Sequence, residues 1–210
     1  SANGNVAGAT LLATYTRSQN LAAGSAYSRT ESVTVPTVAD GDAYVWLVVT
    51  DALSQVYERS GEENNTGGQT AVAVRHPDLR AQSVQVAPTA PLSGSGLTVT
   101  WTGRNAGTGA TAGAAWTDRL YLSTNNTLSA DDLLLGSLDH SGALQAAGTY
   151  TASLAVTLPN GISGARYLIV RPDADNVVVE GTGLEAHVGV SAAFTITLAV
   201  IAAAFNIADP

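Results

Sequence analysis

Acidic and amide side chains are the residues of this chain whose spacing could support chemistry. Asp173, Asp175 and Asn176 lie within four residues and could present carboxylate and carbonyl oxygens to calcium, a hard cation that takes about six to eight oxygen ligands. The same residues could instead form a hairpin turn in which an Asp side chain bonds the nearby backbone. No EF-hand loop or glycine-rich calcium repeat accompanies them. Calcium is therefore the one cofactor that the sequence suggests, with a turn as the alternative.

Two other stretches are rich in acidic side chains. The first could be a calcium clamp between domains or a polar linker at a sheet edge, and it comprises Glu58, Glu62, Glu63, Asn64 and Asn65. The second, Asp131-Asp132, is typical of a solvated turn.

Catalysis has little support in the sequence. The three histidines, His76, His140 and His187, fall in different predicted loops, and no HExxH or G-x-S-x-G pattern is present. Because any acidic protein contains pairs of carboxylates, such pairs do not identify a hydrolase. We therefore predict that the chain is not an enzyme.

Composition excludes several other classes. All nine basic residues are arginines and the net charge is −8, so no basic face for nucleic acid is expected. The absence of cysteine excludes disulfides and thiolate metal sites. The longest apolar run, Phe194 to Phe205, is shorter than the roughly 20 residues that a membrane-spanning helix needs. We expect neither nucleic-acid binding nor a membrane span.

A domain-sized repeat organises the chain. The stretch 51–65 recurs in altered form as 173–187, and each copy follows an apolar run that begins with tyrosine, at Tyr44 or Tyr167. The glutamates that close the two copies, Glu58 and Glu180, are 122 residues apart (180 − 58). An Ala-Ala-Gly sequence recurs at a spacing of 124 (146 − 22). The chain thus enters its first repeat partway through.

Short apolar segments separated by turns predict strands. In the strand expected near Tyr150 to Leu158, alternate residues are apolar, which indicates one buried face. The tyrosine-led runs resemble central strands, and each is expected to form a hairpin with a return strand, Gln55 to Glu58 or Val177 to Glu180. Further strands are predicted in the first copy near Tyr27 to Val35 and at Gln69 to Val74, and in the second copy at Ser83 to Val86, Leu97 to Trp101, Trp116 to Leu122 and Ala192 to Leu198.

These elements predict an all-β fold with tandem immunoglobulin-like antiparallel β-sandwiches, the first incomplete at its N-terminus. Residues 1–75 would form a partial sandwich and residues 76–199 a complete one. Residues 200–210 would be an apolar C-terminal tail. Trp101 and Trp116 are expected to pack in the core of the second sandwich rather than to form a sugar platform.

Several short sequences resemble one family, the bacterial cell-adhesion-related domain, CARDB. They are His76-Pro77-Asp78-Leu79, Arg104-Asn105-Ala106-Gly107, Leu120-Tyr121-Leu122-Ser123, Ala146-Ala147-Gly148 and the Asp-rich hairpin ending in Glu. Glu58, Glu62, Asn64 and Asn65 match the family's E-x-N-N-like ending, whereas the second copy departs from it at 184–187. The resemblance implies immunoglobulin-like repeats of large secreted or surface proteins, with roles in adhesion or as spacers and without enzymatic activity.

The expected function is that of a non-enzymatic structural or adhesive module of a bacterial surface protein or filament, located outside the cell or on its surface. One alternative is a filament subunit that self-assembles when neighbouring chains donate strands to complete it. Another is a β-sandwich that binds calcium or carbohydrate. Expected partners are copies of the chain, neighbouring repeats or surface glycans.

Overall fold

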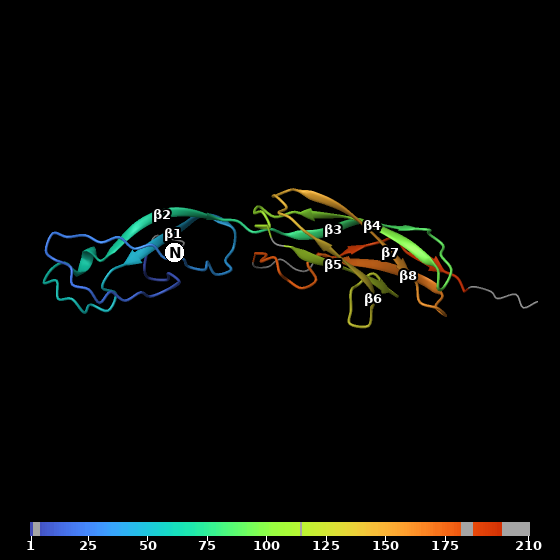
Figure 1. Cartoon of the computed structure of the whole chain (residues 1–210), viewed down its shortest axis with the longest axis horizontal. Helices are drawn as coiled ribbons and strands as arrows, with labels where there is room; N and C mark the ends of the chain where they lie inside the picture. Colours follow the sequence, from blue (N-terminus) through green and yellow to red (C-terminus); the bar gives the residue numbers. More distant parts are fainter. Residues whose placement is uncertain (2–4, 114, 182–186, 199–210) are drawn as a thin grey trace, which may run out of the picture. The chain divides into compact units, whose positions relative to one another are not determined.

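The computed structural model describes residues 1, 5–113, 115–181 and 187–198, apart from the side chains of Glu62 and Gln69. The chain divides into two compact units, Ser1–Arg75 and His76–Pro210. Apart from one short 3-10 helix, η1 (Glu62–Asn64), the described regular structure consists of β-strands. The predicted all-β class is therefore confirmed (Figure 1).

The first unit contains a single antiparallel hairpin in its described residues, β1 (Gly41–Val49) and β2 (Thr66–Val74). In its register Tyr44 faces Val72, and Val49 faces Thr66. Both strands were predicted and are confirmed. The strand predicted near Tyr27 to Val35 is wrong, because residues 5–40 contain neither strand nor helix. Its counterpart in the second unit pairs with a neighbouring strand, and no such strand exists in the described part of the first unit.

Two irregular segments of the first unit lie side by side through paired aromatic and arginine side chains. The guanidinium of Arg17 lies 4.3 Å from the Tyr27 ring centre, and that of Arg29 lies 4.7 Å from the Tyr15 ring centre. The two contacts cross-link residues 15–17 to residues 27–29. Cation–π contacts at exposed sites contribute about 0.5–1 kcal/mol each, so these segments are joined without a backbone ladder.

The second unit is built from two antiparallel sheets (Figure 1). One has the order β3-β4-β7, and the other has the order β10-β8-β5-β6, with β9 also pairing with β8. Their bounds are β3 (Leu79–Ala87), β4 (Gly96–Asn105), β5 (Trp116–Ser123), β6 (Leu133–His140), β7 (Thr149–Thr157), β8 (Gly164–Arg171), β9 (Gly189–Val190) and β10 (Phe194–Ile196). The chain crosses between the sheets after β4, after β6 and after β7, as in immunoglobulin-like sandwiches.

Alternating residues of the two sheets form one core. On β4, Leu97, Val99 and Trp101 are 3%, 0% and 1% exposed, as their spacing predicted. They belong to the same cluster as buried side chains of the second sheet, among them Leu120 and Leu168. The tyrosine-led run of this unit lies on β8, between β10 and β5, which explains why its apolar residues continue without alternation.

The predicted return strands are wrong in both units. Residues 55–58 and 177–180 follow the apolar strands as irregular loops, because an aspartate side chain already accepts backbone N–H groups that a ladder would use. The closing strand is shorter than predicted, since β10 covers Phe194–Ile196 rather than Ala192 to Leu198. The predicted tail, 200–210, lies outside the described residues. No helix in the part of the chain that the structure covers is long and apolar enough to cross a membrane.

Candidate functional site

Asp173 organises the loop that was the candidate calcium site. Its side chain lies directly after β8 and is buried. Oδ1 accepts a hydrogen bond from the N–H of Val177 and Oδ2 accepts one from the N–H of Val178, both at 2.9 Å. The backbone of Asp173 has a φ of 42°, a conformation that Asp and Asn tolerate through such local bonds. Both oxygens of this carboxylate therefore serve the loop itself.

The first unit forms the same loop around Asp51. Its φ is 43°, and its Oδ1 and Oδ2 accept hydrogen bonds from the N–H groups of Gln55 and Val56, both at 2.8 Å. Its carbonyl accepts the N–H of Ser54, as that of Asp173 accepts the N–H of Asn176. The sequence repeat at this spacing is thus also a repeat of backbone geometry.

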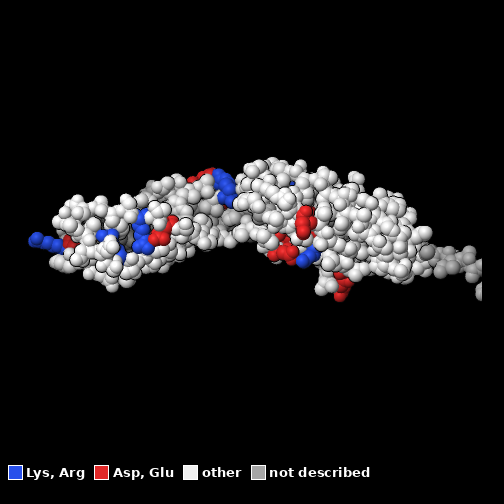
Figure 2. Space-filling model, in the orientation of Figure 1, with Lys and Arg blue, Asp and Glu red and all other residues white. Residues whose placement is uncertain are grey.

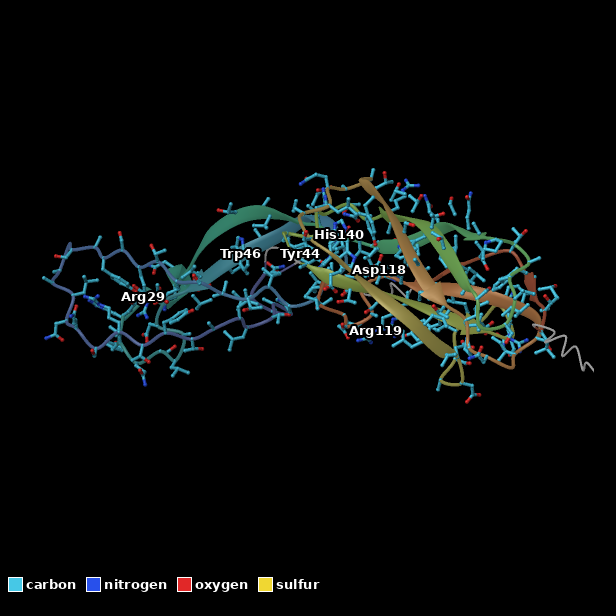
Figure 3. All side chains as sticks on the ribbon, turned by 45° about the vertical axis from the view of Figure 1, so that its right-hand side comes forward. Arg29, Tyr44, Trp46, Asp118, Arg119 and His140 are labelled. Atoms are coloured by element: carbon cyan, nitrogen blue, oxygen red, sulfur yellow. The ribbon has the colours of Figure 1, made fainter. Side chains whose placement is uncertain are left out.

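The other two calcium candidates bind arginines. Asp175 Oδ1 accepts a hydrogen bond from Arg119 at 2.7 Å, and Asn176 Oδ1 accepts one from Arg171 at 3.2 Å. Figure 3 marks Arg119 on the second unit. Within the described residues, no group of three or more His, Cys, Asp or Glu side chains could hold a metal ion. Calcium binding at Asp173, Asp175 and Asn176 stays a prediction.

The acidic stretches outside this loop are separate from it. Asp132 Oδ2 accepts the N–H of Ser129 at 2.7 Å, as expected of a turn. In the first unit the carbonyl of Asn65 accepts the N–H of Thr50 at 2.8 Å and so closes the end of the β1–β2 hairpin. Glu58 is partly buried within its loop, and the side chain of Glu62 is outside the description.

A buried polar cluster centres on Asp118, which the sequence interpretation did not single out. Asp118 is 2% exposed. Its Oδ2 accepts hydrogen bonds from Trp101 Nε1 at 2.9 Å and from the Tyr150 hydroxyl at 2.6 Å. Its Oδ1 accepts one from Trp116 Nε1 at 3.1 Å. One carboxylate therefore joins strands β4, β5 and β7 across the two sheets, inside the second unit (Figure 3).

Burial sets the acid–base properties of this cluster. Desolvation raises the pKa of Asp118, while the hydrogen bonds from Tyr150, Trp101, the Asp173 backbone and Trp116 oppose the rise. Desolvation, together with the charge of Asp118, also raises the pKa of Tyr150 far above its usual value. His140 covers the cluster by stacking on Trp116, with ring centres 4.0 Å apart. Both tryptophans of the unit are buried, which confirms core packing rather than a sugar platform.

A second polar cluster fixes the start of β3. The Leu79 N–H donates to Glu180 Oε1 at 2.5 Å, and desolvation raises the pKa of that glutamate. Buried Asp78 accepts hydrogen bonds from Arg80 Nε and Nη2 at 2.8 and 2.6 Å. Its other oxygen lies 3.2 Å from His187 Nε2, without hydrogen-bond geometry. This cluster joins the first strand of the unit to residues that follow β8.

Asn105 joins three further segments and explains the Arg104-Asn105-Ala106-Gly107 sequence. Its Oδ1 accepts the N–H groups of Asp78 and Gly107, both at 3.0 Å. Its Nδ2 donates to the carbonyls of Gly109, Leu144 and Gln145 at 2.7–3.2 Å. A Cβ at Gly107 would lie 2.3 Å from the His76 carbonyl oxygen, so this position requires glycine.

Two hollows of the second unit border the three-stranded sheet, and neither is lined by an acidic, basic or histidine side chain. Figure 2 shows charged side chains sparsely distributed on the second unit, with most of the visible face uncharged. The acids described above hold strands and loops together. At the surface, the Thr117 hydroxyl donates a hydrogen bond to Asp139 Oδ1 at 2.9 Å.

Comparisons with solved structures found two single domains and parts of larger enzymes. A CARDB domain from Pyrococcus furiosus, crystallised in complex with di-metal ions, is 15% identical with a TM-score of 0.41, covering 59% of this chain and 90% of that one. A domain named for a cell surface protein of Methanosarcina acetivorans is 18% identical with a TM-score of 0.40, covering 59% and 93%. A β-glucosidase from Listeria innocua, in complex with glucose, is 15% identical with a TM-score of 0.36, and 17% of its length is covered.

No curated protein matches the chain. The CARDB family, in contrast, matches residues 76–185, more than half of the 210 residues. The matched range begins at the first residue of the second unit and contains the Asp118, Asn105 and Asp173 clusters together with Glu180. The chain therefore belongs to the CARDB family.

Proposed function

We propose that the chain is a non-enzymatic structural module of a bacterial surface protein, located outside the cell and acting in adhesion through protein contacts. The observation that supports this function best is the use of three acids that are buried or partly buried. Asp118, Asp173 and Glu180 each accept hydrogen bonds that join strands or shape loops. Acids held in this way stabilise the fold.

Antibody labelling of cells that produce the protein tests its location. Antibodies against the purified chain should label intact cells, and mild protease treatment of those cells should remove the signal. Labelling that appears only after permeabilisation would contradict the proposal. For adhesion, a strain lacking the chain should attach less to surfaces or to other cells, and external addition of the purified chain should compete with attachment of the parent strain.

Self-assembly by strand donation is a second candidate function, favoured by the outer edge of β1. On the edge of β1 that faces away from β2, the Val45 N–H donates to the Ser1 carbonyl at 2.7 Å, and the Ser1 amino group donates to the Val45 carbonyl at 3.0 Å. No further strand pairs with this edge within the described residues. An open edge can take up a strand from another chain. Deletion of Val200 to Pro210 should lower the oligomeric state in sedimentation if the tail is the donor. An identical monomeric state with and without the tail would dismiss assembly.

Calcium or carbohydrate binding is a third candidate, carried by Asp173, Asp175 and Asn176. Asp175 is exposed at the loop surface, where an incoming cation could compete with Arg119. Calorimetric titration with calcium should give heat that disappears when Asp175→Ala and Asn176→Ala are combined. These substitutions leave Asp173 and its backbone bonds intact. No heat and no rise in melting temperature with the parent chain would exclude the calcium site, and a glycan array tests carbohydrates separately.

A further inference from the structure

The two units share local structure beyond the Asp51 and Asp173 loops. A tight turn at Ala22 to Ser25 has the Ser25 N–H bonded to the Ala22 carbonyl at 3.0 Å, and Gly24 has a φ of 76°. In the second unit the Gly148 N–H bonds the Gln145 carbonyl at 2.9 Å, and Ala147 has a φ of 62°. The turns are therefore 123 residues apart (148 − 25). The Ala-Ala-Gly alignment made from the sequence is wrong by one residue, and Leu21 corresponds to Leu144.

These shared turns identify three further pairs of corresponding residues with opposite environments. Val178 is 6% exposed, whereas Val56 is 60% exposed. Leu144 is 8% exposed, whereas Leu21 is 48% exposed. Glu180 accepts a backbone N–H at 2.5 Å, whereas Glu58 Oε2 is buried without a hydrogen-bond partner among the described residues.

In the second unit Leu144, Val178 and Glu180 all interact with one residue, Leu79. Its side chain is 3% exposed and belongs to the same cluster as Leu144 and Val178. Its N–H is the donor to Glu180. The first unit thus carries the counterparts of the acceptor and of the two apolar contacts of β3, but a strand like β3 is not among its described residues.

We propose that the first unit binds an extended segment from outside residues 1–210 that has the chemistry of the start of β3. One residue of this segment donates its N–H to Glu58 and places an apolar side chain on Val56 and Leu21. A buried carboxylate oxygen without a donor is costly, and burial of exposed valine and leucine is favourable. Both contributions favour the complex. A second copy of the chain does not supply its own β3, because Leu79 is buried there and bonded to Glu180.

A peptide with the sequence of His76–Ala87 is the direct probe, titrated into the full chain and followed by calorimetry and by NMR. We expect saturable binding that shifts the resonances of Val56 and Leu21. Because a hydrogen bond to a charged group is at stake, Glu58→Ala should weaken binding about tenfold or more. A peptide with N-methyl-leucine at the Leu79 position lacks the donor and should lose a similar factor. Glu63→Ala, an exposed acid in the same stretch, should leave affinity unchanged.

A matched pair of valines tests the apolar contact. Val56 and Val48 are both 60% exposed, and neither substitution to Asp disturbs a packed core. Val56→Asp should weaken peptide binding, whereas Val48→Asp should not. Absence of saturable binding by the parent chain would overturn the proposal, as would equal affinity for the peptide with and without Glu58. The proposal would also be overturned if the chain alone self-associates and Glu58→Ala abolishes this self-association, because the occupant would then be a second copy. The proposal rests on the comparison of the two units and not on the cellular location of the protein.

Discussion

The buried carboxylate of Asp118 gives the sharpest stability prediction. Substitution by alanine would remove the acceptor for three donors, the indole N–H groups of Trp101 and Trp116 and the hydroxyl of Tyr150. Each buried donor left without an acceptor costs about 1–3 kcal/mol. Relief of carboxylate desolvation offsets part of the loss, and the Tyr150 hydroxyl, 3.4 Å from Trp116 Nε1, can satisfy one indole in part. We expect Asp118→Ala to lower the free energy of unfolding of the second unit by about 3–5 kcal/mol.

Urea unfolding followed by tryptophan fluorescence measures this change. A Trp46→Phe background removes the tryptophan of the first unit, so that Trp101 and Trp116 report on the second. Tyr150→Phe removes a single donor and should cost about 1–2 kcal/mol. In a double-mutant cycle the combined variant should lose clearly less than the sum, because both substitutions delete the same 2.6 Å bond. A loss below about 1 kcal/mol for Asp118→Ala, or full additivity, would refute the reasoning.

Three further predictions concern the loops and the buried acids. Asp173→Ala should lower the free energy of unfolding by about 2–4 kcal/mol, because the N–H groups that Asp173 accepts are partly or fully buried. Asp51→Ala should lower it by about 1 kcal/mol or less, because the exposed N–H groups of Gln55 and Val56 can bond water. Paired urea titrations compare the two, and equal losses would contradict this explanation. Gly107→Ala should destabilise the second unit by about 1–3 kcal/mol in thermal unfolding, because its Cβ meets the backbone of residues 76–78; Gly96→Ala, where the nearest atom lies 3.8 Å from the added Cβ, is the control for clash. Because burial raises the folded-state pKa values of Asp118 and Glu180, their protonated forms favour the fold. The stability that they contribute is complete below about pH 4 and is lost as pH rises through the raised pKa values. Asp118→Asn should reduce this loss of stability with rising pH, measured as the free energy of unfolding at a series of pH values. An unchanged pH dependence would show that other groups cause the loss.

Alternation predicted β4 and β7 of the second unit, whereas β6 and β9 were not predicted. Leu97, Val99 and Trp101 occupy one face of β4, and the same spacing predicted the partly buried face of β7. These predictions succeed because a strand exposes its side chains to two sides in turn. The tyrosine-led run on β8 was also predictable, since a continuous apolar strand must be covered on both faces. The expectation of a central strand is wrong for β1, which pairs only with β2 among the described residues and leaves Val48 60% exposed.

The same alternation contained the signal for the polar clusters. Asp118 stands on the face of β5 that carries Trp116 and Leu120, and Asn105 stands on the core face of β4. A polar residue on the core face of a strand requires hydrogen-bond partners. Its position in the alternating pattern is therefore enough to indicate a structural role. Its partners were not predictable, because Trp101 and Tyr150 approach Asp118 from strands of the opposite sheet. The contact of Glu180 with Leu79 spans 101 residues and has no local signal.

Each copy of the repeat contains an aspartate and a glutamate, and the two acids differ in how far along the chain their hydrogen-bond donors lie. Asp51 and Asp173 bond residues four and five positions ahead, so this loop forms in either unit from local sequence. Glu180 instead bonds the start of a distant strand. Its counterpart Glu58 has the same position after the same loop, but its buried Oε2 has no donor among the described residues. The local loop is therefore present in both units, whereas the contact of the glutamate depends on a strand that the loop itself does not supply.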